Sequence, residues 1–208
     1  FYSPHTLANL QAQIRQLQYG EHNFIGIGAD VQLAENQLTG NINSDNKYLL
    51  LDGKIDGLLL KDTISARMNV DVHRLDMKQL AIARDSMTWT FHFNAEAQTN
   101  VKDSLEARAS LTDVKVLTRK RTFTPKNLHT ALLLQPDTVF VHAEAGDFYL
   151  DIQTEEGVDT LMTRLDTLQT IFARQFAEKR ISVTEVQEAW PRACIKMRSG
   201  NDNPFSNF

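Results

Sequence analysis

Apolar residues recur at every second position through most of this chain, and polar residues occupy the positions between them. The pattern runs through 25–33, 64–72, 87–97 and 105–111. In its clearest segment the apolar positions are Met87, Trp89, Phe91, Phe93, Ala95 and Ala97. A side-chain period of two predicts β-strands with one apolar and one polar face. We therefore expect a mainly β protein whose stacked strands share one long apolar face.

Residues that favour turns separate these segments at short intervals. Three such places are 35–36, 135–137 and 145–147, and the Asp-Gly pairs at 52–53 and 56–57 are typical of tight hairpins. Turns this close together leave room only for strands that reverse direction each time. The sequence therefore predicts an antiparallel meander.

The expected meander covers about 10–152 and contains two irregular places. The segment around Leu10 and Ile14 fits either a strand or a helical stripe, and we favour a strand. The alternation slips by one residue at Thr112 and Asp113, which predicts a β-bulge or a turn there.

The period changes in the last quarter of the chain. An apolar stripe with helical spacing predicts an amphipathic α-helix over about 157–178. Ser182, followed three residues later by Glu185, is a capping-box signature for a second, short helix that Pro191 would end. Alternation then returns and predicts a final strand. The stripe of the first helix consists of Val158, Leu161, Leu165, Leu168, Phe172 and Phe176.

These elements fit a single β-rich module over 1–208, because no linker-like composition divides the chain. Within it, helices occupy about 156–191, and the final strand with its turn occupies 193–208. The chain opens on Phe1 and Tyr2 instead of Met, so we expect a piece excised from a longer protein.

Charge and composition exclude several classes of partner. The formal net charge of -4 argues against nucleic acid, which needs a basic surface for phosphate contacts. No apolar run is long enough for a membrane-spanning helix. The only cysteine, Cys194, has the apolar neighbours Ala193 and Ile195, which predicts a buried, unreactive thiol.

Catalytic and metal-binding motifs are not evident in the sequence. The six histidines form no metal-ligand spacing, and no nucleophile elbow or phosphate-binding loop is present. His92 and His142 alternate with apolar neighbours, which places them on the polar face. For the basic cluster 119–121, a charged strand face or edge is favoured over an anionic-headgroup contact. We therefore expect no catalytic residue, no metal and no cofactor, and a protein that is not an enzyme.

The apolar face itself is the remaining candidate site. A helix of about twenty residues is about 30 Å long, and strands are spaced about 4.8 Å apart. One helix therefore cannot cover ten or so strands. Either the sheet closes on itself as a β-sandwich, or it curls into an open groove that offers its apolar surface to acyl chains. Both arrangements use the same residues, so both remain open at this point.

If the groove is open, its lining comes from the strands and its cover from the helix. The candidate lining residues are Met68, Val70, Trp89, Phe91, Phe93, Leu105, Leu111, Leu132, Leu134, Val139, Val141, Phe148 and Leu150. The candidate covering residues are Leu165, Leu168 and Phe172.

Two segments carry a resemblance to a known family. The stretch 38–56, with a Gly-x-Ile-x-x-Asp-Asn turn leading into Leu-x-Leu-Asp-Gly-x-Ile-Asp, is similar to the repeating hairpin of AsmA-like and TamB-type envelope proteins. The ending 195–204 also resembles a stretch of TamB-like proteins of the Bacteroidetes type. The resemblance extends thinly over most of the chain through β-repeat patterns.

This resemblance implies a periplasmic fragment of a larger protein anchored in the inner membrane. It implies a long curled sheet with an apolar groove for phospholipid acyl chains, moved between membranes. It further implies support of outer-membrane protein assembly through a barrel partner of the TamA type. The alternative from the residues alone is a closed β-sandwich scaffold that binds a protein through its surface or an edge strand.

Overall fold

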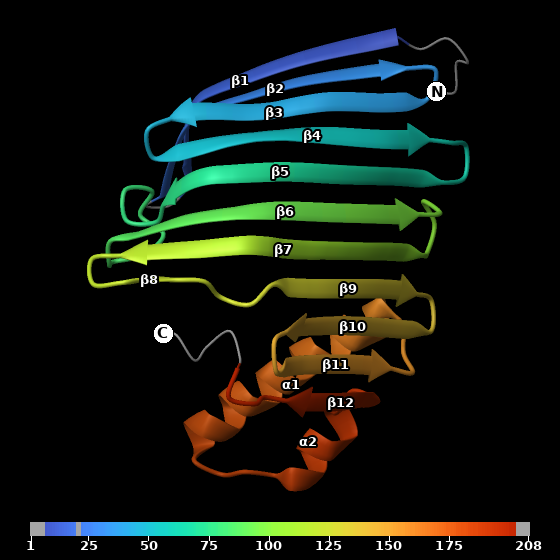
Figure 1. Cartoon of the computed structure of the whole chain (residues 1–208). Coiled ribbons are helices and arrows are strands. Elements are labelled where there is room, and N and C mark those ends of the chain that lie inside the picture. Colours follow the sequence, from blue (N-terminus) through green and yellow to red (C-terminus); the bar gives the residue numbers. More distant parts are fainter. Residues whose placement is uncertain (1–6, 20–21, 203–208) are drawn as a thin grey trace.

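A computed structural model describes residues 7–19 and 22–202, in which one large antiparallel sheet carries two helices on one side (Figure 1). The strands are β1 (Leu7–Tyr19), β2 (His22–Ala34), β3 (Gln37–Asn46), β4 (Leu49–Leu59), β5 (Ile64–Asp76), β6 (Met87–Thr99), β7 (Leu105–Thr118), β8 (Thr122–Phe123), β9 (Leu128–Gln135), β10 (Thr138–Ala145), β11 (Phe148–Thr154) and β12 (Ala193–Arg198). The helices are α1 (Val158–Glu178) and α2 (Val183–Ala189).

The strands lie in the sheet in chain order, from β1 at one edge to β12 at the other, and only the short β8 leaves this path to pair with β7. The sheet is open, so the predicted meander is confirmed, and the described residues form no second sheet over its apolar face. The first segment is strand β1, as favoured from the sequence. β1 and β2 bend behind β3–β5 (Figure 1).

Tight turns explain the sequential order. Glu35 and Asn36 join β2 to β3 with φ angles of 47° and 71°, the left-handed pair that suits the twist of a two-residue hairpin. Gly146, with φ of 58°, lies in the two-residue turn that joins β10 to β11. Each turn therefore places the next strand directly beside the previous one.

The two Asp-Gly pairs are not turns, which corrects the sequence interpretation. Both lie inside β4, where Gly53 pairs with Val70. A Cβ at Gly53 would lie 2.7 Å from the carbonyl oxygen of Asn69 and 2.8 Å from Cγ2 of Val70. The glycine therefore allows β5 to approach closely and does not reverse the chain.

The predicted bulge in β7 is confirmed. Thr90 of β6 pairs with Lys115, whereas His92 pairs with Thr112, so β7 contains an extra residue at this point. Asp113 takes the left-handed conformation there, with φ of 54°. The bulge keeps the apolar residues on both sides of it facing the same way.

Both predicted helices are present, but the capping box is not formed. Ser182 is the N-cap of α2, yet its side chain makes no capping hydrogen bond. Its carbonyl oxygen instead accepts a hydrogen bond from Nε2 of Gln175, and Glu185 pairs with Arg174 of α1. The contact with α1 therefore engages the Glu185 carboxylate, which would otherwise complete the capping box.

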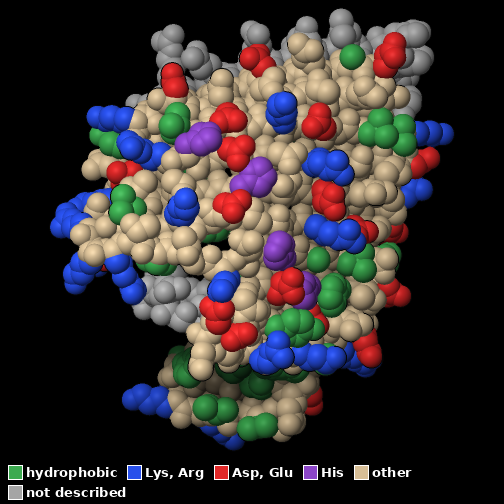
Figure 2. Space-filling model, viewed as in Figure 1, with side chains coloured by type: hydrophobic (Ala, Val, Ile, Leu, Met, Phe, Trp, Pro, Cys, Tyr) green, Lys and Arg blue, Asp and Glu red, His purple; other side chains and the backbone are tan. Residues whose placement is uncertain are grey.

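From β3 to β12, strand alternation and cross-strand register separate an apolar from a polar face. The polar face carries the charged and histidine side chains seen in Figure 2, and α1 lies behind it, on the apolar side (Figures 1 and 2). The apolar face is well buried in two places. One is near the β5–β6 connection, where Leu80 and Val116 are at most 1% exposed, and the other includes Val139 and Leu168.

Between those places the burial is incomplete. The accessible surface of the chain is 14581 Å², whereas a compact monomer of this size would expose about 9,800 Å². The accessible surface is thus larger by roughly half than that of a compact monomer, because a single curved layer leaves much of its surface uncovered.

The prediction for Cys194 is wrong, because this thiol is exposed. It pairs with Gln153 of β11 and so lies on the polar face of β12, the last strand of the sheet. No helix of the described residues combines the length and apolar composition needed to cross a bilayer.

Candidate functional site

Small side chains gather at the centre of the apolar face. Ala95 pairs with Ala109, and Ala97 pairs with both Ala107 and Ala66, so five alanines from β5, β6 and β7 form one contiguous floor. Their side chains end at Cβ, whereas those of the residues in the neighbouring rows extend further. The sheet is therefore hollowed where the alanines meet.

The hollow has a volume of about 610 Å³ and reaches from β4 to β10. Besides the alanines, its apolar lining comes from Ile55, Met68, Leu132 and Val141. Thr130 pairs with Ala109 on the same face, and its hydroxyl donates to the Ala109 carbonyl oxygen. Three residues at strand positions that alternate to the opposite face also border the hollow, namely Arg67, Glu96 and Arg108. Six strands spaced about 4.8 Å apart span about 24 Å. The hollow is thus an elongated trough that crosses the strands.

Sequence reasoning identified the flanks of this trough better than its floor. Of the thirteen candidate lining residues, Met68, Leu132 and Val141 line it. Two rows of other candidates flank it on the same face, one through Val70, Phe93 and Leu111 and one through Leu105, Leu134 and Val139.

The remaining candidates also share the apolar face but lie further away. Trp89 and Phe91 belong to the end of β6 next to the β5–β6 connection, and Phe148 and Leu150 belong to β11 near the sheet edge. All four are half-buried.

The alanine floor was missed because alanine alone is a weak signal. The sequence does contain a signal that could have located the floor. Alanines alternate in two consecutive strand segments, at 95 and 97 and at 107 and 109. Only the register of β6 on β7 shows that the four residues meet.

The predicted cover is incomplete. Leu168 is 6% exposed and packs inward, but Leu165 and Phe172 are 43% and 37% exposed. The buried side of α1 instead includes Gln175, at 4% exposure, in line with Leu168. α1 lies behind β10–β12 (Figure 1), and no residue of α1 is among those that line the trough.

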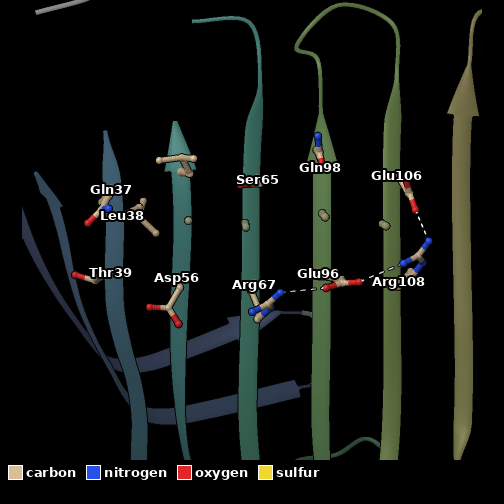
Figure 3. A pocket seen from close by; sticks show the side chains of 15 residues that line it. Gln37, Leu38, Thr39, Asp56, Ser65, Arg67, Glu96, Gln98, Glu106 and Arg108 are labelled. Atoms are coloured by element: carbon tan, nitrogen blue, oxygen red, sulfur yellow. Dashed lines mark hydrogen bonds and ion pairs between the residues drawn. The ribbon is translucent and has the colours of Figure 1, made fainter. Parts of the chain in front are cut away.

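The opposite, polar face carries a ladder of alternating charges. Cross-strand register aligns Asp56, Arg67, Glu96 and Arg108 on four consecutive strands (Figure 3). Glu96 lies 3.6 Å from both arginines, and Arg108 lies 2.6 Å from Glu106. These groups border a shallow hollow of about 810 Å³. Because both arginines already face a glutamate, these groups offer no surplus positive charge to an anionic ligand.

Histidine–aspartate pairs continue the polar face. His73 lies 2.6 Å from Asp52, and His92 lies 2.6 Å from Asp71. This placement confirms His92 on the polar face. The pairs are open to solvent, as cross-strand partners on a wet sheet surface usually are.

The third such pair, His142 with Asp151, is the most sheltered. Nδ1 of His142 lies 2.7 Å from Asp151, and the Tyr149 hydroxyl donates a second hydrogen bond to the same carboxylate. These hydrogen bonds, that of Tyr149 first, hold the pKa of Asp151 below its ordinary value, and the same contact raises the pKa of Tyr149. His142 is thus also on the polar face, as predicted.

The basic cluster 119–121 lies in the β7–β8 connection and not on a strand face. In the described part of the chain, no group of three or more His, Cys, Asp or Glu side chains is placed to hold a metal ion.

Comparison with known proteins adds no relative: no family model, no curated protein and no solved structure matches this chain. The function must therefore be argued from the geometry.

Proposed function

We propose that this chain is a non-enzymatic module whose apolar trough holds or conducts phospholipid acyl chains. The observation that carries the proposal is the alanine-floored hollow of about 610 Å³ on the open side of a single sheet. Strand alternation directs the neighbouring charged ladder to the other face. An acyl chain in the trough would therefore meet a largely apolar lining, in which the Thr130 hydroxyl is already hydrogen-bonded to the Ala109 carbonyl oxygen.

The dimensions of the trough suit such a guest. It spans about 24 Å across the strands, whereas one leaflet of a bilayer core, which holds one acyl chain end to end, is about 15 Å thick. Each methylene transferred from water contributes about 0.8 kcal/mol. A continuous apolar strip thus binds a chain without any single dominant residue.

The sequence resemblance supports the setting of this activity. We place the module in the periplasm, within a parent protein anchored in the inner membrane, where it would shelter phospholipid passing between membranes. Cooperation with an outer-membrane barrel protein of the TamA type belongs to the same proposal. The rival idea of a scaffold with a closed sandwich core is less well supported, because the sheet is open.

A matched pair of variants on β6 tests the trough. Ala97 and Gln98 are neighbours in sequence but lie on opposite faces, so Ala97→Asp places a carboxylate in the trough and Gln98→Asp places one outside it. We expect native mass spectrometry to detect co-purified phospholipid in the unsubstituted 208-residue chain, called the parent chain below, and in Gln98→Asp. Ala97→Asp should bind a fluorescent phospholipid at least about tenfold more weakly, because its charge is desolvated by the guest.

A second variant, Phe91→Asp, places a carboxylate on the same face nearer the β5–β6 connection. It should also block the passage of acyl chains and weaken phospholipid binding. Circular dichroism must show that all variants keep their β-rich fold. Equal phospholipid binding by folded Ala97→Asp and Gln98→Asp would contradict the proposal. If the parent chain is purified without lipid and takes up no added phospholipid, the proposal is also contradicted, and a protein partner at an edge strand is favoured.

A further inference from the structure

Exposed apolar side chains concentrate at the turn between the two helices. Phe176, Ile181 and Val183 are 71%, 70% and 61% exposed. Among the large apolar side chains of the described residues, only Met197 of β12 is equally open, at 71%. We call residues 176–183 the helical tip. It lies at the opposite end of the molecule from β1 (Figure 1).

The tip is a well-defined turn. Lys179 has a left-handed conformation, with φ of 52°, and its N–H donates to the carbonyl oxygens of Gln175 and Phe176. The N–H of Arg180 donates to Gln175 over 3.0 Å, and the Gln175 side chain donates to the Ser182 carbonyl oxygen. Backbone and side-chain hydrogen bonds therefore hold the apolar residues in their outward positions.

Basic side chains are interleaved with these apolar ones. Lys179 and Arg180 are both exposed, and within the described residues neither makes an ion pair. Glu185, the nearest acid on α2, is paired with Arg174. Glu178 is the only acidic residue in the tip, so its net charge is positive.

This combination is typical of a surface that enters the headgroup region of a membrane. Apolar side chains reach the acyl boundary, while lysine and arginine extend to the phosphates. A second copy of this chain is a poorer occupant, because a two-fold contact would bring Lys179 and Arg180 close to their own copies. A protein interface would need a broader apolar area than three separated side chains offer.

We propose that the helical tip docks on the surface of an anionic phospholipid bilayer, with Phe176, Ile181 and Val183 inserted and Lys179 and Arg180 on the lipid phosphates. The inference deepens the proposed function, because such a bilayer would supply or receive the acyl chains. The docking itself stands on the tip and does not require the trough.

Co-sedimentation with vesicles tests the docking. The parent chain should bind vesicles of equimolar phosphatidylcholine and phosphatidylglycerol and bind pure phosphatidylcholine much more weakly. Lys179→Gln with Arg180→Gln should weaken binding to the anionic vesicles roughly thirtyfold, at about fivefold for each basic residue. Phe176→Ser with Ile181→Ser should weaken binding to both kinds of vesicle.

Matched controls lie far from the tip. Val101→Ser with Leu117→Ser removes two apolar side chains of 57% and 55% exposure, and Arg119→Gln with Lys120→Gln removes two exposed basic ones. Both control variants should bind like the parent. The proposal is overturned if a control weakens binding as much as the matching tip variant, or if the parent does not bind.

Two further outcomes separate this inference from its rivals. Light scattering that shows a dimer, dispersed by Phe176→Ser with Ile181→Ser, would assign the tip to a second copy and overturn membrane docking. Uptake of a fluorescent phospholipid supplied as dispersed monomer tests the trough alone. If tip variants keep that uptake but lose vesicle binding, the docking is supported; if the parent shows uptake without vesicle binding, only the docking fails.

Discussion

Among single residues, Asp151 has a carboxylate that is partly buried on the polar face and engaged by two neighbours. It accepts hydrogen bonds from Tyr149 on its own strand, and it faces His142 on β10. Both contacts favour the ionised carboxylate, which explains why the pKa of Asp151 lies below its ordinary value of 3.8. The pair therefore ties β10 to β11 most strongly when Asp151 is charged.

The direction of the pH dependence follows. A folded-state pKa below the unfolded value stabilises the protein above the unfolded value, and this stabilisation is lost as pH falls through the folded pKa. For Tyr149 the folded pKa is raised above 10.0, so its contribution is present below that pH and is lost as pH rises through the folded pKa. Between the folded-state pKa values of Asp151 and Tyr149, the carboxyl group is ionised and the hydroxyl group is protonated, so the hydrogen bond between them is intact.

We expect Tyr149→Phe to raise the pKa of Asp151 toward its ordinary value, because the strongest hydrogen bond to the carboxylate is removed. An NMR titration of the Asp151 carboxyl carbon measures the change. Tyr48→Phe, which alters a tyrosine near the β3–β4 turn, should leave that titration unchanged. An unaltered Asp151 titration in Tyr149→Phe would show that the hydroxyl does not stabilise the charged form.

At the scale of elements, α1 is stabilised by a narrower face than its sequence stripe indicates. Leu168 is buried, whereas Leu165, which lies on the same predicted stripe, is 43% exposed. Gln175 shares the buried face and donates to both Ser182 and Glu185 across the turn into α2. The helix therefore uses part of its apolar stripe for packing and leaves part of it open.

The same substitution at two positions distinguishes these roles. Leu168→Ala should lower the free energy of unfolding by about 2 kcal/mol or more, because it leaves a cavity beneath the helix. Leu165→Ala should change it by less than about 1 kcal/mol, since the side chain is already partly in water. Chemical denaturation of both variants measures the difference. Similar losses would mean that the predicted stripe packs along its whole length.

At the scale of the whole molecule, the fold is a single layer in which each long strand pairs only with its neighbours in the path. Stability then depends on position in the sheet. Ile195 and Met197 of β12 are 57% and 71% exposed, whereas several strands further inside the sheet carry buried apolar residues. These residues are Leu49 in β4, Val70 and Val72 in β5, Val114 and Val116 in β7, and Val139 and Ala145 in β10. The centre should hold together when the C-terminal edge opens.

Hydrogen exchange with mass spectrometry can map this gradient. Amides of β5, β7 and β10 should exchange more slowly than those of β12, because local opening follows the density of buried apolar contacts. Uniform protection across these strands would instead indicate one cooperative unit that includes the edge.

Much of this architecture could be predicted because strand alternation is a local property. The period of two in 87–97 is enough to assign β6 and its faces, and the slip at Thr112 and Asp113 is enough to locate the bulge. The Asp-Gly pairs misled for a physical reason: glycine serves equally in a turn and where a neighbouring strand approaches closely, as at Gly53.

Which side chains share a face follows from the sequence wherever a strand is regular, because successive side chains there point to opposite faces. The sequence could not determine whether that face is covered or open, since a buried core and an exposed trough use the same apolar residues. That depends on three relations between distant residues: the register that joins Ala95 with Ala109 and Ala97 with Ala107, the open path from β1 to β12, and the placement of α1 behind β10–β12. Exposure at Cys194 was decided in the same way, because only the assembled sheet shows that β12 is its last strand.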